Sequence, residues 1–377
     1  MKHVHSNPRR ATASALAALL VAAAAPALAE RVERPIDRSF DAAAIRKVEI
    51  ENLAGDMVVA GVEGGSIRVH GTVFAEDSAG RTGAQLADSL VVEFDPSGGR
   101  LTVRAVYPTA HRRFHYPRRE NNVDLPWFLE WAQDWGSTVR YQGREVRVTG
   151  EAGSGAATLY ADFRLELPPG VTVTAKNLVG TIRSEGVRGD QTLDTASGPI
   201  FARGGHGSLV ADTGSGDVEI VDHQGDALAD TGSGDVTLRH VRGEKLSADT
   251  GSGDVELVDC HGAIDADTGS GNVVGSGLVA GAKVRADTGS GDVRLAGDFS
   301  AVRDLTIDTG SGDVTLTLSA SPSLRLAVST GSGDIDVDVP DMHVRRWKGE
   351  FLADLGRAEG NGTIDTGSGD VSVRSSR

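Results

Sequence analysis

The heptapeptide Asp212-Thr-Gly-Ser-Gly-Asp-Val218 decides the fold of this chain, because it returns along the C-terminal half at a nearly constant interval. The other identical or nearly identical copies begin at Asp194, Asp230, Asp249, Asp267, Asp287, Asp308, Ser329 and Asp365. Successive copies begin 18, 18, 19, 18, 20, 21, 21 and 36 residues apart. A period of about 20 residues is typical of stacked structural repeats, so we expect an array in which each period forms one unit.

Each period contains two short segments that read as strands, for example 208–212 and 217–221. Because side chains alternate along a strand, Leu209 and Ala211 share one side, as do Val218 and Ile220 after the turn. Two strands per period imply a coil of strands. The expected fold is all-β, a right-handed, β-helix-like parallel β-solenoid with rungs of 18–21 residues. Nine rungs would be about 40 Å long.

The heptapeptide suits the corner between the two strands of a rung. Asp212 can accept a hydrogen bond from a turn amide, and glycine permits a positive φ. The glycines expected to form these corners are Gly214, Gly216, Gly232, Gly234, Gly251 and Gly253. Weaker copies at 52–57 and 177–182 indicate that the array begins before its most regular part.

Composition divides the chain into three parts. Residues 1–29 combine a basic start, an apolar run over 15–25 and Ala27-Leu-Ala29, which together predict a cleaved signal peptide and a periplasmic or extracellular protein. Residues 30–170 read as less regular β-rungs with an insertion near 107–145. Residues 171–377 read as regular solenoid repeats with an insertion near 340–362, expected to be a loop or short helix in place of a rung.

Charge and composition exclude several classes of protein. The formal net charge is −15, and it becomes −18 when the three basic residues of the leader are removed (−15 − 3), so nucleic acid is a poor match as a partner. Cys260 is the only cysteine, which excludes internal disulfides. After the leader, no apolar run is long enough for a transmembrane span.

The insertion near 107–145 holds the candidate binding residues. Trp127, Trp131 and Trp135 recur every four residues on a helix expected over 124–135, so they share one face. This face either covers the β-core or forms a stacking platform for a sugar, an acidic polymer or another protein. Further candidates for such a platform are Arg112, Arg113, Tyr116, Arg118 and Arg119.

Stacked rungs would align the repeated aspartates into two columns about 4.8 Å apart along the stack, a spacing at which carboxylates repel. Turn-amide hydrogen bonds with solvent screening are the favoured means of offsetting this repulsion, and Ca²⁺ held between rungs is the alternative. No cofactor is therefore expected unless calcium binds. The candidate calcium ligands are Asp212, Asp217, Asp230, Asp235, Asp249 and Asp254.

Four histidines suggest a further column. His206, His223, His240 and His261 each follow the start of their own copy by 10 to 12 residues, so we expect them to share the opposite corner. A column of imidazoles could bind zinc or nickel or respond to mild acid, but the neighbouring glycines favour exposed turn residues.

Catalytic residues are not predicted, because the sequence repeats the same residues where an active site needs a few different ones in one pocket. Ser215 lies in Gly-Ser-Gly and not in the G-x-S-x-G elbow of hydrolases. Some parallel β-helix proteins are polysaccharide lyases or hydrolases, which keeps a carbohydrate-active enzyme as an alternative by fold analogy alone.

The residues also resemble a known family. The run Val48-Glu-Ile-Glu-Asn-Leu-Ala-Gly-Asp-Met-Val-Val59, the segment Ser66-Ile-Arg-Val-His70 and the repeated Thr-Gly-Ser-Gly-Asp-Val together resemble the bacterial adhesin-type family called domain of unknown function 4097. The resemblance implies a β-solenoid of strand repeats. The leading function is an exported non-enzymatic scaffold, an adhesin or envelope binding protein whose partner is an envelope protein or glycan. A periplasmic structural or stress-linked protein that acts through protein partners is the alternative from another class.

Overall fold

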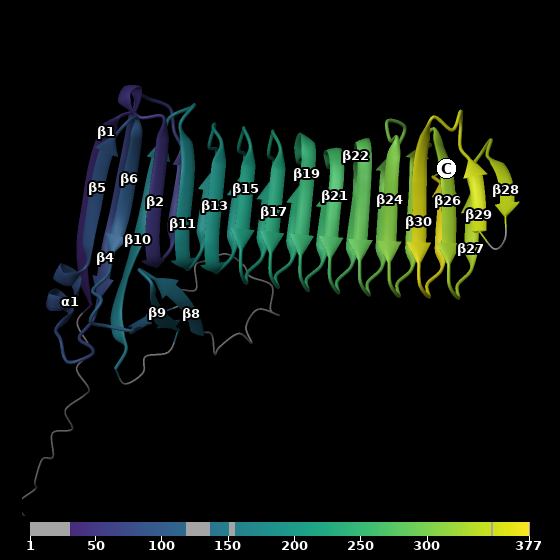
Figure 1. Cartoon of the computed structure of the whole chain (residues 1–377). Coiled ribbons are helices and arrows are strands. Elements are labelled where there is room, and N and C mark those ends of the chain that lie inside the picture. The colour runs from purple at the N-terminus through teal and green to yellow at the C-terminus, as the bar shows by residue number, and fades with distance from the viewer. Residues whose placement is uncertain (1–30, 118–135, 151–154, 348–349, 377) are drawn as a thin grey trace, which may run out of the picture.

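The computed structural model describes residues 31–117, 136–150, 155–347 and 350–376. Its strands form two long ladders that face each other, and the chain passes from one ladder to the other twice in each rung, so the fold is a parallel β-solenoid as predicted (Figure 1). The handedness of the coil stays a prediction.

Ladder 1 carries the strand that precedes each heptapeptide corner. In spatial order it contains β5 (Val91–Ser97), β6 (Arg100–Val106), β2 (Lys47–Ala54), β11 (Thr172–Val179), β13 (Gln191–Ser197), β15 (Leu209–Thr213), β17 (Ala227–Thr231), β19 (Arg242–Thr250), β21 (His261–Thr268), the second half of β22 (Val273–Thr288), β24 (Asp304–Thr309), β30 (Gly360–Thr366), β26 (Leu324–Thr330), β29 (Glu350–Asp354) and β28 (His343–Trp347).

Ladder 2 carries the strand that follows each corner. In spatial order it contains β1 (Val32–Asp41), β4 (Ser66–Ala75), β10 (Ala157–Leu167), β3 (Met57–Gly61), β12 (Ile182–Glu185), β14 (Ile200–Arg203), β16 (Val218–Val221), β18 (Val236–Arg239), β20 (Val255–Val258), the first half of β22, β23 (Val293–Asp298), β25 (Val314–Ala320), β31 (Val371–Ser375) and β27 (Ile335–Asp338).

The hydrophobic core lies between the two ladders. In each rung it is filled by the inward side chains of one strand from each ladder. Leu209 and Ala211 from ladder 1 meet Val218 and Ile220 from ladder 2, and none of the four is more than 1 % exposed. Each rung contributes the equivalent set, so the buried surface grows by stacking and needs few aromatic residues. The inward and outward sides predicted from alternation are therefore correct.

The array does begin before the regular heptapeptides. Asn52 of β2 pairs in register with Asn177 of β11, and Asn177 pairs with Thr195 of the first clear copy. The Asn52 amide donates to Asn177 Oδ1 at 3.2 Å, and the Asn177 amide donates to the carbonyl of Gly55 at 2.7 Å. The weaker copies at 52–57 and 177–182 are thus rungs of the same stack.

Shorter elements surround the N-terminal end. The 3₁₀-helix η1 (Ala42–Ala44) and helix α1 (Gly83–Ser89) join this end, and α1 begins with a capping box formed by Thr82 and Gln85. Strands β7 (Arg113–His115), β8 (Gly136–Tyr141) and β9 (Arg144–Thr149) form a small sheet beside β10 (Figure 1). The helix expected over 124–135 lies outside the described residues.

The C-terminal end corrects the expectation for 340–362. This segment contains two strands, β28 and β29, which form an antiparallel hairpin on the outer edge of β26, and not a loop or short helix. The chain then returns, and β30 and β31 stack between the rung of β24 and β25 and the rung of β26 and β27. The last copy in the sequence is therefore not the last rung in space.

The described residues contain no helix that is long and apolar enough to cross a membrane. The predicted signal peptide, residues 1–29, lies outside the described residues and stays a prediction.

Candidate functional site

The heptapeptide corner is shaped by close stacking of backbones. A Cβ added at Gly234 would lie 2.0 Å from the carbonyl oxygen of Gly216 in the rung below, and one added at Gly232 would lie 2.4 Å from that of Gly214. The φ angles of these four glycines, and of Gly251 and Gly253, are not positive. The expectation of positive φ was therefore wrong for these six glycines, at which the missing side chain is what the corner requires. The equivalent Gly55, Gly180 and Gly198 of the earlier copies have both a positive φ, of 135°, 124° and 144°, and no room for a Cβ.

A column of buried threonine hydroxyls lies on the inner side of the same corner. The hydroxyl of Thr250 donates to the carbonyl of Gly234 at 2.7 Å in the rung below and accepts the N–H of Gly253 at 3.1 Å in its own rung. Thr231 and Thr268 make the same two bonds. The threonine column provides hydrogen bonds to amides and carbonyls of the corner that burial would otherwise leave unpaired. Its sequence signal is the threonine at the second position of every copy.

The second aspartates of the copies form a column that is tied by hydrogen bonds. The carboxylate of Asp217 accepts the backbone N–H of Asp235 at 3.0 Å, and that of Asp235 accepts the N–H of Asp254 at 2.8 Å. Asn272 replaces aspartate in the column and still accepts the N–H of Asp292 at 3.0 Å. These are the amide bonds that the sequence favoured as the means of offsetting carboxylate repulsion. Burial still raises the pKa of Asp217, and the charge of Asp235 adds to the shift.

The first aspartates of the copies form an outward row on ladder 1, which we call the Asp row. Its members pair from rung to rung in register, and the eight positions extend over roughly 34 Å at the usual strand spacing. In spatial order they are Asp194, Asp212, Asp230, Asp249, Asp267, Asp287, Asp308 and Asp365.

Like charges face each other in the Asp row, and two cations lie beside it: Arg285 near its middle and Lys176, 3.7 Å from Asp194, at its N-terminal end. Partial burial and then the charges of the neighbouring aspartates raise the pKa values of Asp212 and Asp249. Arg285 lies beside the row and contacts both Asp267 and Asp287 at 2.7 Å. In the described residues, no group of three or more His, Cys, Asp or Glu side chains is arranged to hold a metal ion, and the calcium sites stay a prediction.

The four histidines do not form the predicted column. They occupy three different positions of the opposite corner. His206 and His261 share one position but lie three rungs apart, with Gln224 and Arg242 between them, while His223 and His240 each occupy another. His240 is exposed and lies between Asp222, at 3.0 Å, and Asp259, at 3.5 Å. The preceding strands β14, β16, β18 and β20 are all four residues long, so the corner is the same in each rung. The prediction failed because the histidines occupy different positions within that corner: His240 is its positive-φ residue, His223 is the next residue, and His206 and His261 are one further on.

His223 is the histidine that the core encloses. It is 1 % exposed, and its Nε2 bonds to the carbonyl of Gly207 at 2.8 Å, whereas its Nδ1 has no partner among the described residues. The amide nitrogen of Gln191 is also buried without a partner, and its oxygen accepts the hydroxyl of Ser184. Both unpaired nitrogens approach Gly205, where a side chain is missing. Burial therefore lowers the pKa of His223, with a smaller contribution from the charge of His206.

The binding residues predicted in the insertion are only partly visible. Trp127, Trp131, Trp135, Arg118 and Arg119 lie outside the described residues.

The three other predicted binding residues lie on or beside β7. Arg112 and Arg113 are exposed, and their part in binding stays a prediction. Tyr116 is only 4 % exposed; its hydroxyl donates to Asp56 at 2.7 Å and its ring packs against Tyr160. Burial, followed by the Asp56 charge, holds the Tyr116 pKa well above its usual range. Tyr116 thus braces the insertion against the stack, and its predicted place on a ligand platform was wrong.

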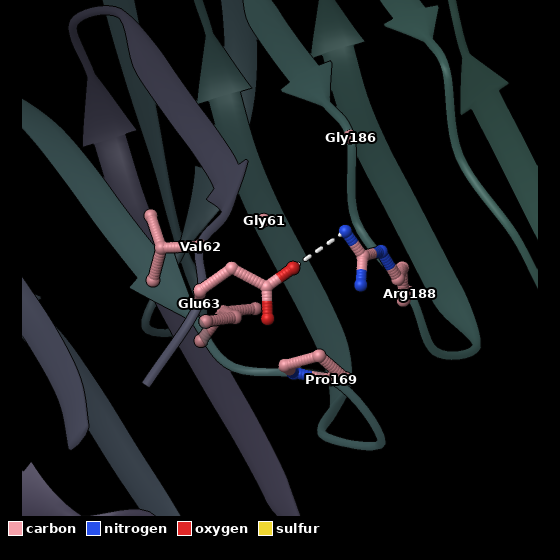
Figure 2. Close-up of a pocket in the computed structure, with 7 residues that line it drawn as sticks. Gly61, Val62, Glu63, Pro169, Gly186 and Arg188 are labelled. Carbon is pink, nitrogen blue, oxygen red and sulfur yellow. Dashed lines mark ion pairs between the residues drawn. The ribbon is translucent and has the colours of Figure 1, made fainter. Parts of the chain in front are cut away.

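A small pocket lies at the N-terminal end of the regular array, and sequence reasoning missed it. Its volume is about 120 Å³, and Figure 2 shows the Glu63 carboxylate reaching across it toward the Arg188 guanidinium, at 2.7 Å. The remaining lining residues are Gly61, Val62, Leu167, Pro169 and Gly186. Both charged side chains are more than half exposed and neutralise each other, so the pocket offers little to a ligand.

The chain is similar to known proteins. Two solved structures are similar over most of the chain: the "putative cell adhesion protein" from Clostridium sporogenes ATCC 15579, with 8 % identity, 92 % of this chain and 100 % of that chain covered and a TM-score of 0.21, and the "putative lipid binding protein" from Parabacteroides distasonis ATCC 8503, with 13 % identity, 91 % and 97 % covered and a TM-score of 0.30. No curated protein matches the chain. The family model described as Toastrack DUF4097 matches residues 171–374, more than half of the sequence. The chain therefore belongs to the Toastrack DUF4097 family.

Proposed function

We propose that this chain is an exported, non-enzymatic β-solenoid scaffold that binds an envelope protein or a glycan, as an adhesin does. The observation that carries the proposal is the in-register stacking of like residues from Asp194 to Asp365. Such stacking produces long faces of repeated side chains, which suit contact with an extended partner. Catalysis would instead need a few different groups in one pocket.

The insertion is the place we propose for specific contact. The faces of the regular rungs repeat the same side chains and so distinguish poorly between partners, whereas the insertion interrupts the repeat. Arg112 and Arg113 are exposed there, at the start of β7, which pairs with β9 on one side and with β10 of the stack on the other. Arginines near Trp127, Trp131 and Trp135 would combine charge with aromatic stacking, a combination that suits sugars and protein surfaces.

The test is retention of the full exported chain on isolated bacterial envelopes. The variant Trp127→Ala/Trp131→Ala/Trp135→Ala should lose about tenfold or more in affinity if the insertion carries the contact. A variant Arg239→Ala/Arg294→Ala, which changes two outward arginines of ladder 2, serves as the control and should bind as the wild type does. Equal binding of the tryptophan variant would exclude the proposed contact, and failure of the wild type to bind would exclude the scaffold role.

Treatment of the envelopes identifies the kind of partner. Loss of binding after protease digestion would indicate a protein, and loss after periodate oxidation would indicate a glycan. Circular dichroism of each variant should show the wild-type β-sheet spectrum, so that a loss of binding is not a loss of fold.

A further inference from the structure

The last three rungs of the stack do not follow the order of the sequence. Residues 360–375, which form strands β30 and β31, lie between the rung 304–320 and the rung 324–338. β30 pairs with β24 on one side and with β26 on the other, and β31 pairs likewise with β25 and β27. The stack therefore contains a slot between two earlier rungs, and the C-terminal end of the chain fills it.

The contacts in the slot are the same ones that join every other pair of rungs. Thr366 donates to the carbonyl of Gly312 at 2.9 Å, and Thr330 in turn donates to that of Gly369 at 2.9 Å. The carboxylate of Asp313 accepts the N–H of Asp370 at 2.9 Å. Nothing in these contacts depends on which molecule supplies the rung. An identical rung from a second copy of the chain would make all of them.

The turn that leads into the C-terminal rung is short and strained. Residues 355–359 connect β29 to β30, and within them Gly356 has φ 57° and Ala358 has φ 55°. A side-chain-bearing residue such as alanine is disfavoured at positive φ. The turn is pinned by Ser323, whose Oγ accepts the N–H of Arg357 at 3.1 Å and whose carbonyl accepts that of Gly360 at 2.9 Å. Opening the turn would release the strain at Ala358.

We propose that the C-terminal rung, residues 360–375, exchanges between two copies of this chain. In the exchanged dimer each copy inserts its rung into the slot of the other, and 355–359 extends as the hinge. A short strained hinge and a segment whose contacts are all preserved are the conditions that favour such exchange. The second copy is the occupant that the slot fits, because it alone carries the matching register and corner residues. The dimer would join two stacks at the end that carries β26 to β31, which lies opposite to the end that carries β1, β4 and β5 (Figure 1).

A mixing experiment with full-length chains tests the exchange. Ser329 Oγ donates to Asp365 Oδ1 at 2.8 Å across the slot, so cysteines at these positions are close enough for a disulfide. Chains carrying Ser329→Cys are mixed with chains carrying Asp365→Cys, held in mild urea, diluted and oxidised. Exchange should give a disulfide-linked dimer. The control is a mixture of Asp230→Cys chains with Asp249→Cys chains, because these two positions are neighbours in the part of the stack that follows the order of the sequence. The yield of dimer should be at least about ten times that of this control. Equal yields in the two mixtures would overturn the proposal.

Two further variants keep the test decisive. A single chain with both Ser329→Cys and Asp365→Cys should form an internal disulfide, which shows that the variants fold with the described rung order; its absence would overturn the basis of the proposal. Ala358→Gly removes the strain from the hinge and should lower the yield of exchanged dimer by roughly fivefold. An unchanged yield would overturn the assignment of 355–359 as the strained hinge.

Discussion

Two positions of each rung, one at each corner, obey different constraints, although the same chain forms both corners at the same spacing. At the heptapeptide corner the residues barely change, because each rung leaves no room for a Cβ above Gly216 or Gly234. At the opposite corner one position takes Gly, Asp or His in successive rungs. Its φ values are 63° at Gly186, 66° at Gly204, 55° at Asp222, 53° at His240, 51° at Asp259 and 63° at Gly277. Uniform residues thus mark a requirement for space, and variable residues mark a requirement for backbone angle alone.

The largest expected difference between the corners is in the free energy of unfolding that is lost when one glycine at each corner is replaced by alanine. Gly234→Ala places a Cβ 2.0 Å from the carbonyl oxygen of Gly216, so two rungs must separate, and we expect a loss of about 3 kcal/mol in the free energy of unfolding. Gly204→Ala meets no atom closer than 4.0 Å and only places alanine at a φ of 66°, for a cost of about 1 kcal/mol. Urea unfolding followed by circular dichroism measures both. Equal losses of unfolding free energy in the two variants would mean that the lack of space between stacked rungs is not what selects glycine at the heptapeptide corner.

The same contrast shows how far the sequence could predict the structure. Strand alternation decided which of Leu209, Ala211, Val218 and Ile220 face the core, because the side-chain period of a strand is two. The registry of the copies predicted the columns of aspartates. The reason for the glycines was missed, since positive φ and lack of space both select glycine and only the packing of the next rung distinguishes them.

The opposite corner was predicted less well for a geometric reason. The four histidines follow the starts of their copies by 12, 11, 10 and 12 residues, and a difference of one residue in a strand reverses the side to which a side chain points. His206 and His261, both at offset 12, do share a position, and His223 at offset 11 turns into the core. The order of the last rungs could not be predicted, because nearly identical copies pair equally well with one another.

The next largest effect is expected from a change of pH, which should alter the free energy of unfolding through His223 at the opposite corner. Burial lowers the pKa of His223 in the folded chain, so between that value and about 6.5 the unfolded chain binds a proton that the folded chain does not. The free energy of unfolding should therefore decrease as the pH falls below about 6.5, by at most about 1.4 kcal/mol at pH 5.5 from this residue. His223→Gln should remove that part of the pH dependence.

The control for His223 is His261→Gln, which changes a partly exposed histidine of the same corner. It should keep the wild-type dependence of the unfolding free energy on pH between 7.5 and 5.5. If His223→Gln and the wild type lose stability in parallel over this range, the buried imidazole is not the source of the acid sensitivity.

The smallest expected effect lies in the Asp row. Here protonation should stabilise the folded chain, whereas protonation of His223 destabilises it. Burial and the charges of Asp230 and Asp267 raise the pKa of Asp249, so its charged form is disfavoured in the folded chain and protonation stabilises it. Asp249→Asn should accordingly raise the free energy of unfolding at pH 7 by about 0.5 kcal/mol in low salt. High salt should reduce the gain, because it screens the charges of Asp230 and Asp267 but leaves the cost of burial, and Asp95→Asn, an exposed change on β5 away from the row, should have no effect.

The opposite result for Asp249→Asn would change the interpretation of the row. A variant that is less stable than the wild type, and only when calcium is present, would mean that bound cations and not solvent screening balance the carboxylates, since a cation that binds the folded chain stabilises it by mass action. The Asp row would then be a site whose residues repeat because they bind an ion. A gain in stability would leave amide bonds, Arg285 and solvent as the means by which the stack tolerates its own charge.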